Sequence, residues 1–221
     1  MSIADNIRNL RNLMPPGVTL VAVSKFHPAE TILQAYEAGQ KVFGESRVQE
    51  LLGKQKVLPK DISWHFIGHL QTNKVKQLIG NAALIESVDS EKLIDIIERE
   101  SINAGCTSNI LLQVHVAAED TKFGFFHDEI LDYFKSGRYQ KLKATNICGI
   151  MGMATNTEDI NRIKEDFHKI HSIYETLISE YSSSLPDFRF LSMGMSGDWG
   201  LALEEGANIV RIGSAIFGNR N

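Results

Sequence analysis

Short apolar runs alternate with amphipathic stretches along nearly the whole chain. Near-continuous apolar runs separated by helical patterns predict parallel strands that are buried on both faces. Eight runs are present, at residues 18–24, 41–44, 63–68, 83–88, 110–116, 147–151, 188–193 and 208–212. Eight β/α repeats favour a closed (β/α)₈ barrel of the TIM type over an open, doubly wound sheet. We therefore predict an α/β chain that forms a single barrel domain over residues 1–221.

Helix start and stop signals separate these runs. One predicted helix has Pro28 in its first turn and ends at Gly39. Asp89-Ser90 and Asn156-Thr157 precede two further helical patterns. The second run is short, and few residues remain after the eighth run for a last helix. We expect the amphipathic segment at 3–13 to cover part of that gap.

Composition and charge exclude several classes of protein. The net charge of -4 leaves no basic surplus, so we expect no nucleic-acid partner. The sequence lacks both an apolar run of about 18 residues and a charged-then-apolar leader, so we expect neither a membrane span nor secretion. The two cysteines, Cys106 and Cys148, do not suggest a disulfide framework. These features predict a cytoplasmic protein, which we expect to be a monomer.

Two predicted loops carry residues that suit a phosphate group. In barrels of this type, phosphates are often held by the loops after strands seven and eight. Ser196 follows the seventh run, and Gly213 and Ser214 follow the eighth. Glycine lets the backbone approach a ligand, and a hydroxyl can donate to an anion. Either loop alone could be an ordinary solvated turn, but together they indicate a phosphate site.

Lys25 directly follows the first run, in the segment VAVSKFHP. A lysine at a strand end commonly just reaches water. Barrel closure, however, would place this lysine beside the eighth strand and its phosphate loop. Burial there would lower the pKa of the amine, and a free amine can attack an aldehyde to form a Schiff base. A phosphorylated aldehyde suggests pyridoxal 5'-phosphate (PLP), whose pyridine nitrogen Arg211 could contact and keep unprotonated.

Several motifs resemble the pyridoxal phosphate homeostasis protein family over about residues 18–218: VAVSK, FGES with VQE, WHFIGHLQTNK, KFG after LLQV, and LSMGMSGDWGLALEEGANIVRIGSAIFG. That family is similar in fold to the barrel of alanine racemase, a fold-type III PLP protein. The resemblance implies that Lys25 is the Schiff-base lysine and that Arg211 contacts the pyridine nitrogen. The phosphate contacts that it implies are Ser196, Gly213, Ser214 and the backbone of Met195. Lys122 matches a lysine linked with holding or passing PLP, whereas Gln71 and Asn73 lie in a motif to which we assign no role.

Four positions depart from the family pattern. Ser46 and Arg47 replace the usual asparagine and tyrosine, His69 replaces a proline, and His27 replaces a lysine that many members carry. These departures put in doubt a side-chain amide contact from position 46 and a second lysine beside Lys25. They leave the predicted aldehyde, phosphate and nitrogen contacts intact.

Other candidate sites are weaker. His65 and His69 stand four apart on a predicted strand and loop, without a carboxylate at metal-ligand spacing, so we predict core or loop histidines and no metal site. Cys148 is predicted to be a small buried hydrophobe. The charged residues Glu165, Asp166 and His168 are predicted to form the solvated face of a helix. No hydrolase triad is credible, because His168 and His171 have no serine or cysteine nucleophile nearby in the sequence.

The resemblance implies binding more directly than catalysis. A racemase needs an acid or base on each face of the substrate, and alanine racemase takes one from a C-terminal β domain of a partner subunit. Because the sequence ends at Asn221, we expect that domain to be absent. We therefore expect a non-catalytic PLP carrier in intracellular PLP (vitamin B6) homeostasis, with PLP-dependent apoenzymes as candidate recipients. The alternatives are a single-domain PLP-dependent amino-acid racemase and a Schiff-base aldolase, although such aldolases usually place the lysine on a later strand.

Overall fold

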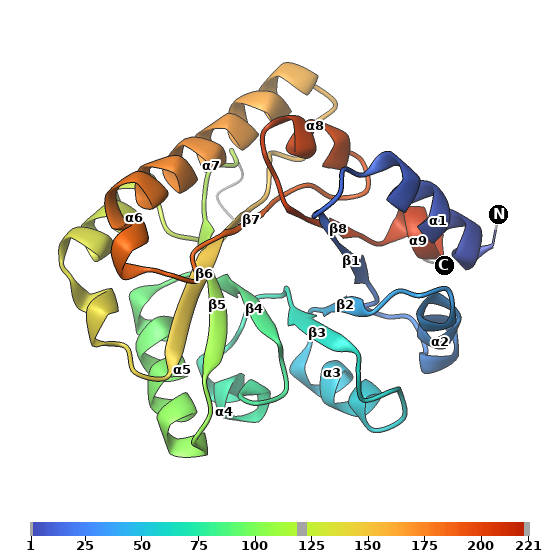
Figure 1. The fold of residues 1–221 in the computed structure, drawn as a ribbon, viewed down its shortest axis with the longest axis horizontal. Helices are drawn as coiled ribbons and strands as arrows, with labels where there is room; N and C mark the ends of the chain where they lie inside the picture. Colours follow the sequence, from blue (N-terminus) through green and yellow to red (C-terminus); the bar gives the residue numbers. More distant parts are fainter. Residues whose placement is uncertain (1, 119–122, 219–221) are drawn as a thin grey trace.

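The strands of this computed structural model, which describes residues 2–118 and 123–218, form one closed parallel barrel in chain order (Figure 1). They are β1 (Thr19–Val23), β2 (Val42–Glu45), β3 (Ser63–Phe66), β4 (Leu84–Val88), β5 (Ser108–Val114), β6 (Thr145–Gly152), β7 (Phe190–Ser192) and β8 (Ile209–Ile212). The barrel closes where β1 pairs with β8, with Ala22 opposite Ile212. A strand lies at each of the eight predicted places, so the predicted (β/α)₈ barrel is confirmed.

Helices follow the strands and surround the barrel (Figure 1). They are α1 (Ile3–Leu13), α2 (Ala29–Glu37), α3 (Val48–Gln55), α4 (Val75–Leu78), α5 (Glu91–Ala104), α6 (His127–Lys135), α7 (Ile160–Tyr181), α8 (Trp199–Glu204) and α9 (Ser214–Phe217), with 3-10 turns at Thr72–Lys74, Arg138–Lys141 and Ser182–Ser184. The last helix is short, as expected, and α1 lies beside it: the Asn6 side chain donates to the Ile216 carbonyl at 2.9 Å. The predicted covering of the gap by α1 is confirmed.

Side chains at helix starts agree with the sequence in one case and differ in another. The Ser90 side chain caps α5 by accepting from the Leu93 amide, as the Asp89-Ser90 signal indicated. Helix α7 is instead capped by Asp159, whose carboxylate accepts from the Asn161 amide at 3.0 Å. The chain needs a few residues after Asn156-Thr157 to cross from the barrel to the helix, so the helix begins later.

The prediction that Asp166 belongs to a solvated helix face is wrong. Glu165 and His168 are exposed, but Asp166 is fully buried. Its carboxylate accepts from the Thr155 amide at 2.9 Å and from the Thr155 hydroxyl at 2.6 Å, because the loop after β6 folds back over this face of α7. Arg162 also forms an ion pair with it at 3.2 Å. Asp166 therefore ties that loop to the helix.

Apolar packing occupies both sides of the barrel wall. The larger core lies between the strands and the helices, and a smaller cluster includes Val21, Leu111, Cys148 and Met151. Cys148 is buried, as predicted, and burial raises the pKa of its thiol to about 11. Within the described ranges, no helix combines the length and the apolar character that a membrane span requires.

Gly149 marks a bulge in the barrel wall and gives a test of the fold. The pairing of β5 with β6 shifts between Ile110 and Leu111, and Gly149 there has φ +149°. An added Cβ would lie against the Phe190 carbonyl oxygen, at 1.9 Å. We expect Gly149→Ala to lower the free energy of unfolding by more than about 2 kcal/mol, because backbone strain adds to a backbone clash.

The matched control is Gly53→Ala. Gly53 lies within α3, and an added Cβ would meet no atom within 4 Å. This variant should gain about 0.5–1 kcal/mol, since alanine stabilises a helix interior relative to glycine. Urea unfolding of both variants measures the difference, and parental stability of Gly149→Ala would contradict the assigned bulge.

Candidate functional site

A pocket of about 600 Å³ opens at the carboxyl ends of the strands. Its lining residues come from the ends of β1, β3, β6, β7 and β8: Val23, Lys25, Ile67, Met153, Met195, Ser196, Gly197, Arg211, Gly213 and Ser214. The structure therefore brings together the six residues that the sequence analysis proposed as main PLP contacts. Lys122, the proposed secondary contact, lies outside the described residues.

Some lining residues were missed by sequence reasoning. Val23, Ile67, Met153 and Gly197 line the pocket, but an apolar residue or a glycine at a strand end carries no chemical signal of its own. Their signal is positional, because each of the three apolar residues ends a strand or directly follows one. They give the pocket an apolar wall beside the polar groups.

The pairing of β1 with β8 brings Lys25 close to the loop that follows β8. An added Cβ on Gly213 would lie 3.3 Å from the Val23 carbonyl oxygen, which shows how closely the two strand ends approach. The Gly213 amide donates to the Ser196 hydroxyl oxygen at 3.2 Å, so the loops after β7 and β8 are also joined. Residues that are far apart in the sequence thus form one polar wall.

The loop after β7 is held against α8. Gly194 has φ +92°, and an added Cβ would lie 2.7 Å from the Ala202 Cβ, so this close approach requires glycine. The Met195 amide donates to the Asp198 carboxylate at 2.5 Å. Met195 lines the pocket, but its N–H, which the family resemblance implicates in phosphate contact, is engaged with Asp198 in this structure.

Arg211 ends a buried polar chain that crosses the barrel interior. Its side chain is 4% exposed and donates to the Ser192 hydroxyl and, at 2.9 Å, to the Gly152 carbonyl. The Ser192 hydroxyl donates to Glu86 at 2.5 Å, and the Glu86 carboxylate also lies 2.6 Å from His65 Nδ1. The guanidinium is therefore fixed in place beside the pocket by groups from β4, β6 and β7.

The charges in this chain balance one another. Burial lowers the pKa of Arg211, and the Glu86 and Asp198 carboxylates oppose that shift, so the guanidinium remains a cation. Burial by itself would raise the pKa of Glu86. The hydrogen bond and charge of His65, the charge of Arg211 and the Ser192 hydroxyl outweigh it and lower the pKa. The pocket therefore faces a cation that a buried anion compensates.

The four departures from the family pattern lie around the mouth of the barrel. His69 stacks on Phe123, with ring centroids 3.7 Å apart, and its Nδ1 lies 2.9 Å from an Asp89 oxygen. The Arg47 guanidinium lies over the Phe26 ring, and the His27 ring packs against Phe217; Ser46 approaches Gly68 through its backbone. None of the four lines the pocket in the part of the chain that the structure describes.

The sequence analysis did not predict the carboxylates that pair with His65 and His69. Glu86 and Asp89 come from β4 and its following turn, so they are distant in sequence from the histidines that they contact. His65 is a core histidine and His69 an exposed loop histidine. Over residues 2–118 and 123–218, no group of three or more potential ligand side chains has the geometry of a metal site.

Comparison with known proteins defines the class of this barrel. The family model "Alanine racemase, N-terminal domain" matches residues 1–221. Alanine racemase of Clostridium difficile superposes with a TM-score of 0.79 at 14% identity, over 99% of this chain and 56% of that one, which establishes a common fold. The fold is therefore that of the alanine racemase N-terminal barrel.

Nearer relatives identify the family. PipY of Synechococcus elongatus, solved without PLP, is 36% identical with a TM-score of 0.89, over 98% of this chain and 100% of that one. PipY with PLP bound gives a TM-score of 0.86. The pyridoxal phosphate homeostasis protein of Aquifex aeolicus is 40% identical over 202 residues, covering 91% of this chain and 86% of that protein. The chain belongs to the pyridoxal phosphate homeostasis protein family.

Proposed function

We propose that this protein binds PLP as a Schiff base on Lys25 and serves as a carrier in intracellular PLP homeostasis. The main observation in support is that an amine, two hydroxyls and a guanidinium line one pocket. The PLP bound to PipY and the names of the relatives support PLP binding and a role in PLP homeostasis. Our proposal includes a monomeric, cytoplasmic carrier that passes PLP to PLP-dependent apoenzymes.

The pocket fits the chemistry of the cofactor. Its volume of about 600 Å³ lies within the range that holds small ligands, roughly 300–1,000 Å³. PLP supplies an aldehyde that condenses with a primary amine, forming one C=N bond and releasing one water. In the proposal, Lys25 supplies that amine, and Ser196, Gly213 and Ser214 hold the phosphate.

Arg211 suits the pyridine nitrogen because a guanidinium only donates hydrogen bonds. In the proposal it donates to the ring nitrogen and leaves that nitrogen unprotonated, since two cations in contact would repel each other. The fixed hydrogen bonds of Arg211 to Ser192 and Gly152 hold it on the pocket side of β8. The protein thereby disfavours charge build-up on the ring.

The lining of the pocket favours a carrier over the alternative, an amino-acid racemase. Among the described lining residues, Lys25 and Arg211 are the ones with titratable side chains. A racemase must move protons on both faces of its substrate, so it needs two such groups. Lys25 can serve one face, while Arg211 is held by the buried chain and keeps its proton.

Borohydride reduction tests the proposal. Reducing the protein in the presence of PLP should fix a phosphopyridoxyl group on Lys25, because reduction makes the C–N bond to that amine permanent. Mass mapping of peptides locates the group. Lys25→Arg should carry no adduct, whereas Lys41→Arg, which alters an exposed lysine paired with Asp61, should be labelled like the parent. An adduct on another lysine alone would overturn the assignment.

A further inference from the structure

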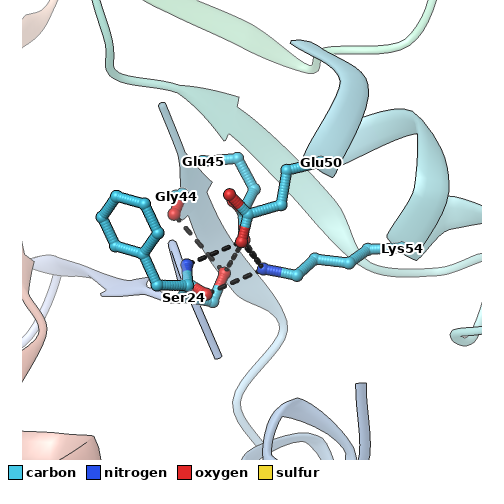
Figure 2. Close-up of polar contacts among 6 residues, drawn as sticks. Ser24, Gly44, Glu45, Glu50 and Lys54 are labelled. Carbon is cyan, nitrogen blue, oxygen red and sulfur yellow. Dashed lines mark hydrogen bonds and ion pairs between the residues drawn. The ribbon is translucent and has the colours of Figure 1, made fainter. Parts of the chain in front are cut away.

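A buried ion cluster lies beneath the segment that carries Lys25 (Figure 2). At its centre is Lys54 of α3, a lysine only 8% exposed. Its ammonium donates to the Ser24 carbonyl at 2.8 Å, to Glu45 at 2.6 Å and to Glu50 at 2.7 Å. An ammonium has three donors, so these contacts use the whole hydrogen-bonding capacity of Lys54.

The cluster holds the peptide groups on both sides of Lys25. The carbonyl before it, that of Ser24, accepts from Lys54. The amide after it, that of Phe26, donates to Glu50 at 2.6 Å. The Ser24 hydroxyl also donates to Glu45 at 2.5 Å (Figure 2). The Ser24 amide donates to the Gly44 carbonyl at 3.0 Å. The backbone of Lys25 is thereby anchored to β2 and α3.

The turn after Lys25 is conformationally unfavourable by itself. Phe26 has φ +69° and is the one non-glycine residue with a positive φ within 2–118 and 123–218. That conformation costs roughly 1–2 kcal/mol for a bulky residue. Phe26 is 53% exposed, so burial of this residue does not explain the conformation. The His27 amide closes the turn by donating to the Ser24 carbonyl at 3.1 Å, and Glu50 holds the Phe26 amide within it.

Burying the charged groups of this cluster carries a desolvation cost. Glu45 is fully buried, and burial raises the pKa of its carboxyl despite the hydrogen bonds from Lys54 and Ser24. A buried ion pair of this kind is often no more stabilising than apolar residues of the same size. A role in placing the neighbouring backbone accounts for both the cluster and the strained turn.

We propose that Lys54, with Glu45 and Glu50, is a clamp that positions Lys25 before the cofactor arrives. These are positioning residues, because they act on Lys25 through its backbone. The inference rests on the proposed function and deepens it: the clamp fixes the segment between β1 and α2 so that the amine already lies in the pocket.

The test compares two ligands on the Lys54→Met and Glu50→Ala variants. Releasing the backbone of one residue should weaken PLP binding about tenfold, since the lost order must be restored on binding. Pyridoxine 5'-phosphate carries an alcohol in place of the aldehyde and forms no bond to Lys25, so its affinity should stay parental. Titration followed by absorbance or fluorescence measures both affinities.

Two further variants sharpen the comparison. Glu50→Gln keeps an oxygen that can accept from the Phe26 amide, so we expect it to restore most of the PLP affinity that Glu50→Ala loses. Lys41→Met removes the exposed Lys41–Asp61 pair at the opposite end of β2 and should change neither affinity. Hydrogen–deuterium exchange of the ligand-free proteins should be faster at residues 24–27 in Lys54→Met and Glu50→Ala than in the parent. The Glu50→Gln and Lys41→Met variants should not show this increase.

The outcomes separate the clamp from the proposed function. Equal weakening of both ligands, or faster exchange with unchanged PLP affinity, would overturn the clamp and leave the cluster a structural role. Absence of a reducible adduct in the parent would instead overturn the proposed function and the clamp with it. Glu50 is partly exposed, so Glu50→Ala keeps the test decisive if Lys54→Met does not fold.

Discussion

Replacing Arg211 by methionine is expected to lower the free energy of unfolding of the ligand-free protein by about 3–5 kcal/mol. The guanidinium lies 3.7 Å from the Glu86 carboxylate and is hydrogen-bonded to Ser192 and Gly152 in the barrel interior. Methionine fills similar space but takes the Arg211 cation away from the buried Glu86 carboxylate. It also leaves the Gly152 carbonyl without a donor, which costs further stability.

A double-mutant cycle isolates this interaction. The Arg211→Met and Glu86→Leu double variant should be destabilised by less than the sum of the single variants, because it leaves neither charge unpaired. Urea unfolding measures each stability. Additive effects would show that the two side chains do not compensate each other. Arg211→Glu is a poorer probe, since it would set a second carboxylate beside Glu86.

The dependence of stability on acid pH gives an independent test of the Glu86 carboxylate. The folded state lowers the pKa of Glu86, so the ionised carboxylate contributes stability above its unfolded-state pKa. That contribution is lost as the pH falls through the folded-state pKa. Glu86→Gln removes the titrating group and should therefore flatten the loss of stability in acid. A parental acid profile in this variant would contradict the assignment.

Incubation with a single-enantiomer amino acid in deuterated water is expected to give negligible racemisation by the PLP-loaded protein. In the proposed arrangement Lys25 would exchange a proton on one face, and among the other described lining residues the one titratable side chain is Arg211, which keeps its proton. In the proposed arrangement, an unprotonated ring facing Arg211 would also stabilise negative charge weakly. Deuterium uptake and chirality are followed together.

An alanine racemase assayed in parallel provides the positive control. Multiple turnovers to the opposite enantiomer would contradict the carrier and support the racemase alternative. Transfer of PLP to an added PLP-dependent apoenzyme, without turnover, would support the carrier.

The sequence predicts the barrel well because each strand and each helix is marked by a pattern among residues close together in the chain. Each buried strand is a continuous apolar run, and each intervening helix repeats its apolar residues at helical spacing. Parallel topology then places every strand end on one side. Lys25, Ser196 and Gly213 therefore converge for a reason that can be read without coordinates.

Buried polar contacts resist the same reasoning. Glu86 and Ser192 are 106 positions apart, and Ser24 lies 30 positions from Lys54. Periodicity assigns a side chain to a face, but it does not identify a polar partner on another element. Asp166 shows the consequence: a charged residue in a charged helix was predicted to be solvated, yet Thr155 of a folded-back loop buries it.

The closure of β1 against β8 imposes an order of events on synthesis. Lys25 emerges from the ribosome early, whereas Arg211, Gly213 and Ser214 emerge near the end of the described chain. Joining them closes a loop of more than 180 residues, from Lys25 to Arg211, which is a slow, non-local step. A nascent chain that stops before β8 therefore has the amine but no complete pocket around it. Retention of the cofactor would then report that β8 has been synthesised and that the barrel has closed.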